Sequence, residues 1–351
     1  MKTKKIVAVA ILAGIFFSSC SKEEPELPKG DYDNGILVSN EGAFSGGTGT
    51  INYISDDYST EAEKIYKAVN NEDLGTIVQS IGFDDDTAYI IANVGNKISV
   101  ANRYSMEKNA TITTDLSNPR YIAFANGKGY VTNWGAGSDT TDDYVAVIDL
   151  ATNLVTQMIS VNEGPEQIVA NNNKLYISHK GGWGSGNSVT VIDAATNTVT
   201  TNITVGDIPD ELFFDNNGFL VVSCEGKAVT NWNPNEVIAK LVRINVTNNT
   251  VSSTLTFASG VHPNVMLKND GKIYFSTPSK VYEMNADATS LPSSEIITTS
   301  VKGLSVSDGK IYTTDAGDNA SNGTLKIFSA STKAELKSFT MGIIPSKIYF
   351  N

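Results

Sequence analysis

The sequence predicts an all-β fold, a seven-bladed β-propeller with four-stranded blades, and three observations support this prediction. Short alternating strand patterns separated by Gly, Asn and Asp fill the chain beyond residue 30, with no long segment of helical periodicity. A four-strand pattern recurs seven times with a period of about 40–45 residues, which is typical of propeller blades. The C-terminal segment supplies a strand that the first repeat lacks, so we expect it to close the ring.

The first two strands of each repeat carry the clearest signals. The first strand begins with a proline in most repeats: prolines at 119, 165, 209 and 263 recur every 44 to 54 residues, and Gly303 and Pro345 extend the series. The second strand has a Tyr-Val-Thr-Asn-like pattern. It is found at residues 36–40 (ILVSN), 89–93 (YIIAN), 130–133 (YVTN), 176–179 (YISH), 220–223 (LVVS), 274–277 (YFST) and 312–315 (YTTD).

The third and fourth strands complete each repeat. The third strand is expected at residues 51–55, 98–102, 145–149, 189–193, 241–245, 281–285 and 325–329, and the fourth follows it, as at 155–161 and 199–205. The first repeat begins at Gly35 with its second strand, and residues 345–350 match the strand that is missing there. The C-terminus is therefore predicted to pair into blade 1, which leaves no open sheet edge between the chain ends.

The N-terminus has the pattern of a secretory signal. Three lysines within residues 2–5 precede an apolar run over 6–17, and two serines precede Cys20. Such a run is too short to span a bilayer stably, so residues 1–19 are interpreted as a signal peptide. We expect residues 20–34 to form a lipidated N-terminus with a flexible tether, and residues 35–351 to form the propeller.

Composition excludes several classes of protein. The 351 residues carry a formal net charge of −12 and no Lys/Arg cluster outside the signal, which argues against nucleic acid as a partner. With 40% hydrophobic and 18% charged residues, the chain can bury a large core. The only cysteines are Cys20 and Cys224, so a disulfide framework is excluded.

The surroundings of Cys20 resemble a known processing site. Residues 17–21 (FSSCS) are similar to the lipobox of bacterial lipoproteins, and the acidic stretch that follows is similar to the surface-export signal of Bacteroidetes-type lipoproteins. The resemblance implies an acylated Cys20 that anchors the protein to the outer membrane, facing the cell surface. The alternative is an ordinary signal peptide with a chance cysteine.

The repeat itself resembles a known family. It is clearest over residues 119–205 and is similar to the YVTN, or YncE-like, propellers. Residues 40–42 (NEG) followed by Phe44, 118–122 (NPRYI) and 314–318 (TDAGD) resemble the Bacteroidetes-type surface propeller lipoproteins that capture cobalamin. This implies a corrinoid-like small-molecule ligand and an outer-membrane, TonB-dependent transporter as partner. The same fold and anchor suit a protein- or glycan-binding propeller for adhesion or surface assembly.

The loops locate the expected binding face. Connections from the second to the third strand are longest in blades 3, 4 and 5 and in blades 7 and 1, and they share a face with the Pro-led connections between blades. We expect a concave site across the ring mouth on that face. The three tryptophans, Trp134, Trp183 and Trp232, fall in this loop of blades 3, 4 and 5, and we expect a ligand-facing cluster with Phe44 opposite. The alternative is that they pack between blades.

Polar candidates lie on the same face. His179 and His262 are expected to contact the ligand or to be satisfied hydrogen-bonding histidines, and their spacing does not indicate a metal site. Arg120 is suited either to a ligand carboxylate or phosphate or to an ion pair between blades. Rim acids favour ligands with amide or cationic groups over polyanions; they are Glu163, Glu166, Asp207, Asp210 and Glu211.

The sequence gives no sign of catalytic chemistry. It contains no nucleophile elbow, no His-rich metal set and no paired-acid motif that breaks the repeat. We therefore expect no catalytic residue, metal or cofactor, and a binding protein rather than an enzyme.

Overall fold

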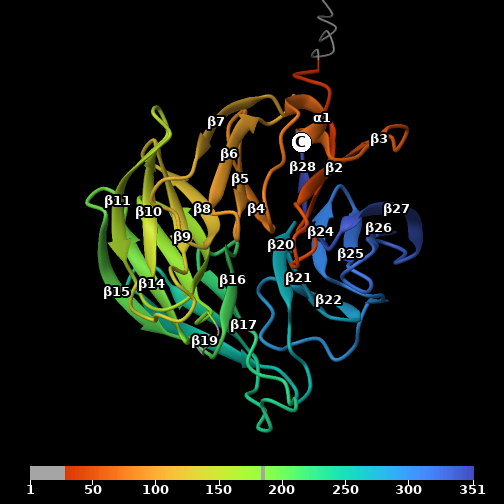
Figure 1. Ribbon diagram of the computed structural model, residues 1–351. Coiled ribbons are helices and arrows are strands. Elements are labelled where there is room, and N and C mark those ends of the chain that lie inside the picture. The colour runs from red at the N-terminus through yellow and green to blue at the C-terminus, as the bar shows by residue number, and fades with distance from the viewer. Residues whose placement is uncertain (1–27, 183–185) are drawn as a thin grey trace, which may run out of the picture.

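Seven four-stranded antiparallel sheets are arranged in a ring in the computed structural model, which describes residues 28–182 and 186–351 (Figure 1). This confirms the predicted all-β, seven-bladed propeller. The signal segment, Cys20 and Trp183 lie outside the described residues. One helix, α1 (Ile65–Asn70), follows the outer strand of blade 1 and buries Ile65 and Tyr66. No described helix is long and apolar enough to cross a membrane.

In each blade the first strand named lines the channel, and the last strand named lies at the outside of the ring. Blade 1 consists of β28 (Pro345–Phe350), β1 (Gly35–Asn40), β2 (Thr50–Ser55) and β3 (Glu61–Ala62). Blade 2 consists of β4 (Val78–Asp84), β5 (Thr87–Ala92), β6 (Lys97–Asn102) and β7 (Lys108–Ile112). Blade 3 consists of β8 (Pro119–Ala125), β9 (Lys128–Asn133), β10 (Tyr144–Asp149) and β11 (Leu154–Ser160). Blade 4 consists of β12 (Pro165–Asn171), β13 (Lys174–His179), β14 (Ser188–Asp193) and β15 (Thr198–Thr204).

The last three blades follow the same order. Blade 5 consists of β16 (Pro209–Phe214), β17 (Leu220–Cys224), β18 (Lys240–Asn245) and β19 (Thr250–Thr256). Blade 6 consists of β20 (Val265–Asn269), β21 (Lys272–Thr277), β22 (Lys280–Asn285) and β23 (Ile297–Thr298). Blade 7 consists of β24 (Gly303–Ser307), β25 (Lys310–Asp315), β26 (Asn322–Ser329) and β27 (Glu335–Ile343).

The chain ends meet in blade 1. Strand β28 pairs antiparallel with β1, with Tyr349 opposite Leu37, so the predicted closure is confirmed. Arg103 of blade 2 secures the end: its Nη2 donates to the Phe350 carbonyl at 2.5 Å and its Nε to Asn351 Oδ1 at 2.8 Å.

Residues 29–34, expected to belong to a flexible tether, lie against the ring. The Tyr32 N–H donates to the Tyr104 carbonyl at 2.8 Å, and Tyr53 donates its hydroxyl to the Asp33 carbonyl at 2.8 Å. Asn351 also donates to the Tyr32 carbonyl at 2.7 Å. The docked chain therefore begins before Gly35.

The core is divided among the contacts between blades. The buried apolar side chains of the described residues form seven clusters, one for each pair of neighbouring blades. Tyr130, from the Tyr-Val-Thr-Asn pattern of blade 3, shows how the blades are joined: its ring is buried in one cluster and its hydroxyl donates to Asn197 Oδ1 of blade 4 at 2.8 Å. Alternating side chains on each strand serve one cluster or the next.

Five of the seven strands that line the channel are irregular just after their first residue. In β8, Pro119 pairs with Asn133 and Ile122 with Val131, so Arg120 and Tyr121 together face the single residue Thr132. The bulge is stabilised by Thr132, whose hydroxyl accepts the Tyr121 N–H at 3.1 Å. Shifts at the same place occur in β4, β12, β16 and β28. Bulges redirect side chains, and here they bring two consecutive residues to the channel.

Candidate functional site

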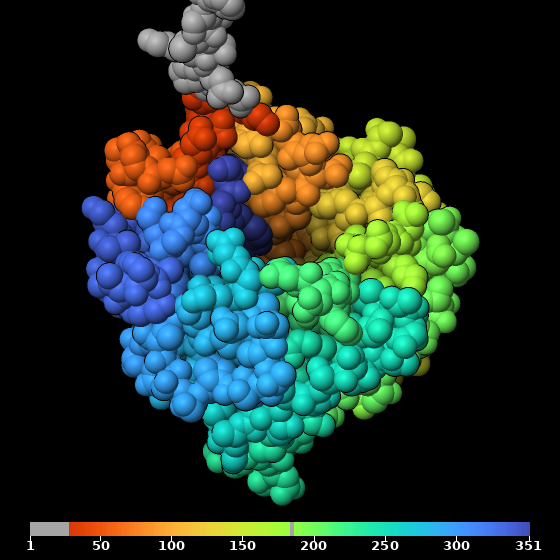
Figure 2. All heavy atoms as spheres, turned by 180° about the vertical axis from the view of Figure 1, so that it is seen from behind, coloured from red at the N-terminus to blue at the C-terminus, as the bar shows by residue number. Residues whose placement is uncertain are grey.

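A chamber of about 460 Å³ opens at the centre of the ring, on the face that carries the long loops and the Pro-led connections. We call it the upper chamber. Its wall combines bulge residues with loop residues: Trp134 and Lys180 come from loops between second and third strands, and Asn118 precedes the inner strand of blade 3. The space-filling view shows the ring hollowed at its centre (Figure 2). The binding face predicted from loop lengths therefore contains a cavity.

Three side chains form a floor across the channel. Lys347 of β28 reaches Glu211 of β16, with Nζ 3.3 Å from Oε1, and lies 5.4 Å from the centre of the Tyr121 ring. These three residues, the channel floor, also line a second cavity of about 340 Å³, whose other residues lie farther along the inner strands. The upper chamber is thus closed below by an ion pair between blades 1 and 5.

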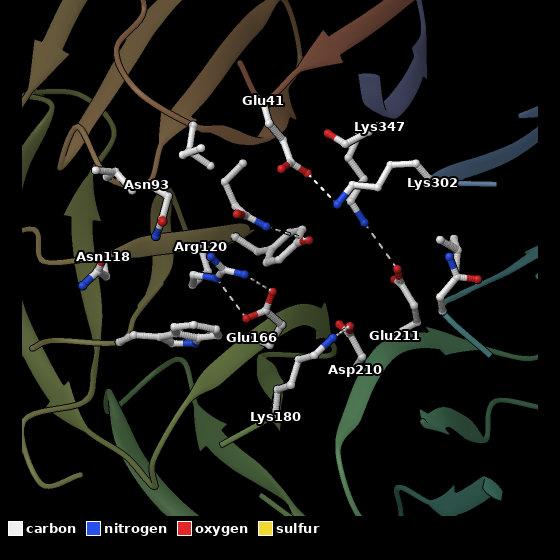
Figure 3. Close-up of a pocket in the computed structure, with 18 of the residues that line it drawn as sticks. Glu41, Asn93, Asn118, Arg120, Glu166, Lys180, Asp210, Glu211, Lys302 and Lys347 are labelled. Carbon is white, nitrogen blue, oxygen red and sulfur yellow. Dashed lines mark hydrogen bonds and ion pairs between the residues drawn. The ribbon is translucent and has the colours of Figure 1, made fainter. Parts of the chain in front are cut away.

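The wall carries equal numbers of opposite charges, joined in pairs (Figure 3). Arg120 donates from Nε and Nη2 to the two carboxylate oxygens of Glu166, at 2.9 and 2.7 Å. Lys302 and Glu41 form a more exposed pair at 3.0 Å. Lys180 Nζ lies 2.5 Å from Asp210 Oδ2 and 3.0 Å from Glu225 Oε1.

Burial and neighbouring charges shift the pKa values of charged groups in and beside this wall. Burial and the nearby Asp210 raise the pKa of Glu225 to about 8. Burial alone would lower the pKa of Lys180, but the carboxylates of Asp210 and Glu225 outweigh it and raise that pKa. Burial and Asp210 also raise the pKa of Glu211, whereas Glu211 and Tyr121 outweigh burial and raise that of Lys347. Such displaced values are frequent at functional sites.

Two predicted aromatic residues line the upper chamber. Trp134 is fixed on two sides, because its Nε1 donates to the Pro165 carbonyl at 3.0 Å and the Arg120 guanidinium stacks 4.0 Å from its ring centre. Phe44, in the blade 1 loop, lines the same chamber with 76% of its surface exposed. For Arg120, the inter-blade ion pair that we considered is formed.

The remaining predicted residues lie elsewhere. Trp232 is 97% exposed and is not among the lining residues, so the structure does not bring it together with Trp134. His179 is 1% exposed and bonded on both nitrogens, to the Glu163 carbonyl and the Thr190 hydroxyl. His262 lies 2.7 Å from the Glu225 carbonyl and 3.0 Å from Glu236 Oε1. Both histidines fit the hydrogen-bonding alternative rather than a place in the chamber wall.

Sequence reasoning missed the residues that close the chamber. Lys180, Lys347 and Tyr121 were not singled out, although Asp210 and Glu211 were noted as rim acids. For Tyr121 and Lys347 a signal exists in the two residues that follow the inner-strand prolines 119, 165, 209 and 345: Arg-Tyr at 120–121, Glu-Gln at 166–167, Asp-Glu at 210–211 and Ser-Lys at 346–347. Each of these residues lines one or both cavities.

Among the residues in 28–182 and 186–351, no group of three or more His, Cys, Asp or Glu side chains is arranged to hold a metal ion. The acids of the chamber wall are instead engaged by lysine and arginine. What the arrangement offers is an aromatic wall, paired charges and the amides of Gln79, Asn93, Asn118 and Asn264.

Several solved structures share the fold. A quinonprotein alcohol dehydrogenase-like protein from Bacteroides thetaiotaomicron is 13% identical with a TM-score of 0.65, covering 91% of this chain and 78% of its own. The periplasmic gluconolactonase of Pseudomonas aeruginosa is 12% identical with a TM-score of 0.65, covering 90% and 98%. The dihydro-heme d1 dehydrogenase NirN, in complex with DHE, is 12% identical with a TM-score of 0.56, covering 93% and 77%. At these identities the similarity shows the propeller fold alone, shared by enzymes and ligand-binding proteins.

Sequence comparison is more specific about the family. No curated protein matches the chain. A family model described as "Domain of unknown function (DUF5074)" matches residues 34–212, about half of the chain, from the first blade into the inner strand of blade 5.

Proposed function

The chain belongs to the DUF5074 family, and we propose that it is a ligand-binding propeller that holds a small molecule rich in amide or cationic groups in its upper chamber. One observation carries this proposal: the chamber is a single cavity with an aromatic wall at Trp134, convergent amides and paired charges, closed below by the channel floor. Its volume lies in the range of about 300–1,000 Å³ found for small-molecule sites.

A corrinoid is the candidate ligand that the sequence resemblance suggests. A whole corrinoid exceeds the chamber, so it would cover the mouth, place an apolar face near Phe44 and Trp134, and insert amide arms toward Asn93 and Asn118. In this proposal the protein is tethered through an acylated Cys20 to the outer membrane, facing outward, and passes its ligand to a TonB-dependent transporter.

The test is a calorimetric titration with cyanocobalamin of the chain lacking residues 1–20, a truncation that removes none of the described contacts. We expect one-to-one binding that weakens in Trp134→Phe and is unchanged in Trp232→Phe, the matched control outside the chamber. Absence of binding at micromolar ligand contradicts the corrinoid proposal. Equal weakening by both substitutions contradicts the placement of the site.

A second candidate function is binding of a protein or glycan at the cell surface. The observation that favours it is the blade 5 loop between β17 and β18, where Trp232 is 97% and Val229 is 64% exposed. Large exposed apolar side chains of this kind are frequent in interaction surfaces. If Trp232→Ala abolishes attachment to a partner or glycan array while Trp134→Phe does not, this second function is supported.

A further inference from the structure

The charges that line the upper chamber are balanced, but Glu225, which contacts Lys180 from outside the lining residues, adds one carboxylate more than the neighbouring cations can pair one to one. Glu166 pairs with Arg120, and Glu211 pairs with Lys347. Asp210 and Glu225 share the single ammonium group of Lys180. Glu41 and Lys302 form their own pair at the rim.

Of the two carboxylates that share Lys180, Asp210 is the one that lines the cavity. It is only 7% exposed, and it lines the upper chamber. Its Oδ2 contacts Lys180. When every carboxylate is ionised, its Oδ1 accepts no hydrogen bond from the described residues. A buried carboxylate oxygen without a donor is costly, so the site is complete only when a proton or a ligand supplies one.

We propose that Asp210 accepts a cationic N–H group of the ligand, a primary ammonium or a guanidinium, and that this group replaces a proton shared by Asp210 and Glu225. The inference rests on the proposed function, because it names the chemistry of the ligand held in the same chamber. It concerns the polar end of that ligand, whereas the aromatic wall at Trp134 concerns its apolar face.

Charge balance supports the exchange. At neutral pH Glu225 keeps its proton, because burial and Asp210 raise its pKa to about 8, and Lys180 then balances Asp210 alone. When a ligand cation arrives, Glu225 ionises, so two cations balance two carboxylates and one proton leaves to solvent. The cation must therefore bind more tightly as the pH rises toward 8.

Other titratable groups around the pair do not supply the missing charge. Glu166 on β12 and Glu211 on β16 add negative charge, and their own cations engage them. Lys347 on β28 acts on Asp210 from across the chamber but contacts Glu211. His262 contacts the main-chain carbonyl of Glu225, not its carboxyl group. The shared proton thus depends on Asp210, Glu225 and Lys180.

Three probes that share an indole ring and differ in their terminal polar group test the inference: tryptamine with an ammonium group, indole-3-acetamide with an amide and indole-3-acetate with a carboxylate. Calorimetric titration of the chain lacking residues 1–20 should give the affinity order ammonium, then amide, then carboxylate, with tryptamine preferred to the carboxylate by about tenfold or more. At pH 7, the binding enthalpies measured in phosphate and in Tris should differ, because the buffer takes up the released proton with its own ionisation enthalpy. The difference should correspond to about one proton per tryptamine bound.

Substitutions separate the roles of the two acids. Asp210→Asn should remove the preference for tryptamine, whereas Asp207→Asn, which deletes the same charge outside the lining residues, should preserve it. Glu225→Gln should still bind tryptamine but release no proton and lose the pH dependence. A merely structural role of Glu225 would not change the buffer dependence of the heat.

The failures are distinguishable. Equal affinity for the three probes, no tryptamine binding, or tryptamine binding without proton release overturns the inference. If cyanocobalamin still binds in that case, the proposed function stands. If neither cyanocobalamin nor any indole probe binds, both are overturned.

Discussion

The buried imidazole of His179 makes the stability of the protein depend on pH in a calculable way. The ring is 1% exposed, with Nδ1 3.2 Å from the Glu163 carbonyl and Nε2 2.7 Å from the Thr190 hydroxyl. The neutral ring can donate from Nδ1 to the Glu163 carbonyl, while the Thr190 hydroxyl, which lies beside Nε2, donates to Asn202 Oδ1 at 2.5 Å. Burial lowers the pKa of His179 from 6.5 to about 4, although its main-chain contacts favour the charged form.

The size and sign of the effect follow from this displacement. The unfolded chain takes up a proton at His179 near pH 6.5, whereas the folded chain resists it until about pH 4. The free energy of unfolding is therefore unaffected by this group above pH 6.5 and falls as the pH drops from 6.5 to 4. At 1.36 kcal/mol per unit of pKa, the loss amounts to about 3 kcal/mol at pH 4.

Urea denaturation of the wild type and of His179→Gln at several pH values between 4 and 7.5 measures this loss. Carboxylates titrate in the same range, so the relevant quantity is the difference between the two proteins, which should shrink by about 3 kcal/mol from pH 7 to pH 4. The chain has only two histidines, so His262→Gln assigns the two imidazole resonances in proton NMR. A pH-independent difference, or a His179 resonance that titrates near pH 6.5, refutes the reasoning.

Three further predictions concern packing and closure. Glu166→Gln leaves the buried Arg120 guanidinium without its carboxylate and should lower the free energy of unfolding in urea by about 3–5 kcal/mol. The control, Glu335→Gln at an exposed site, should change the free energy of unfolding by less than about 1 kcal/mol. Similar values for both variants would contradict the importance of the buried pair. Cys224 is 1% exposed, and burial raises its pKa to about 12. Ellman's reagent should therefore react with the Cys224 thiol only as fast as the chain unfolds. Rapid reaction of the native protein would argue against the burial of Cys224. Deleting residues 345–351 removes β28 and should abolish the cooperative thermal transition seen by circular dichroism; an unchanged midpoint would show that blade 1 is stable without it.

Much of the fold was readable from sequence because the repeat is encoded locally. The Tyr-Val-Thr-Asn pattern fixes a buried strand, and its threonine has a further task that the pattern alone did not reveal, stabilising the bulge of the neighbouring strand, as Thr132 does for Tyr121. Closure by residues 345–350 was predictable because a missing strand and a spare strand match. Helix α1 was not predicted, since its six residues carry too little periodicity to register.

The site was less accessible to such reasoning because its contacts join distant blades. Lys347 and Glu211 are 136 residues apart and meet only because the ring closes, so no local pattern pairs them. Equivalent loop positions suggested that Trp134 and Trp232 would lie together, because they occupy the same loop in blades 3 and 5. The blade 5 loop is longer, however, and leaves Trp232 97% exposed. Repeat position predicts the face of a residue, whereas loop length decides how far it lies from the axis.

The bulges of the inner strands separate the residues that line the channel from those that hold the sheets together. At β8, β12, β16 and β28 the residues after the proline project into the channel, while the strand-to-strand hydrogen bonds resume two or three residues later. Evolution can therefore exchange these short inserts, blade by blade, with little change to the sheets that carry them. Members of a family with this scaffold can therefore differ in the side chains that line the channel, through the two residues after the proline in each inner strand, while the sheets stay the same.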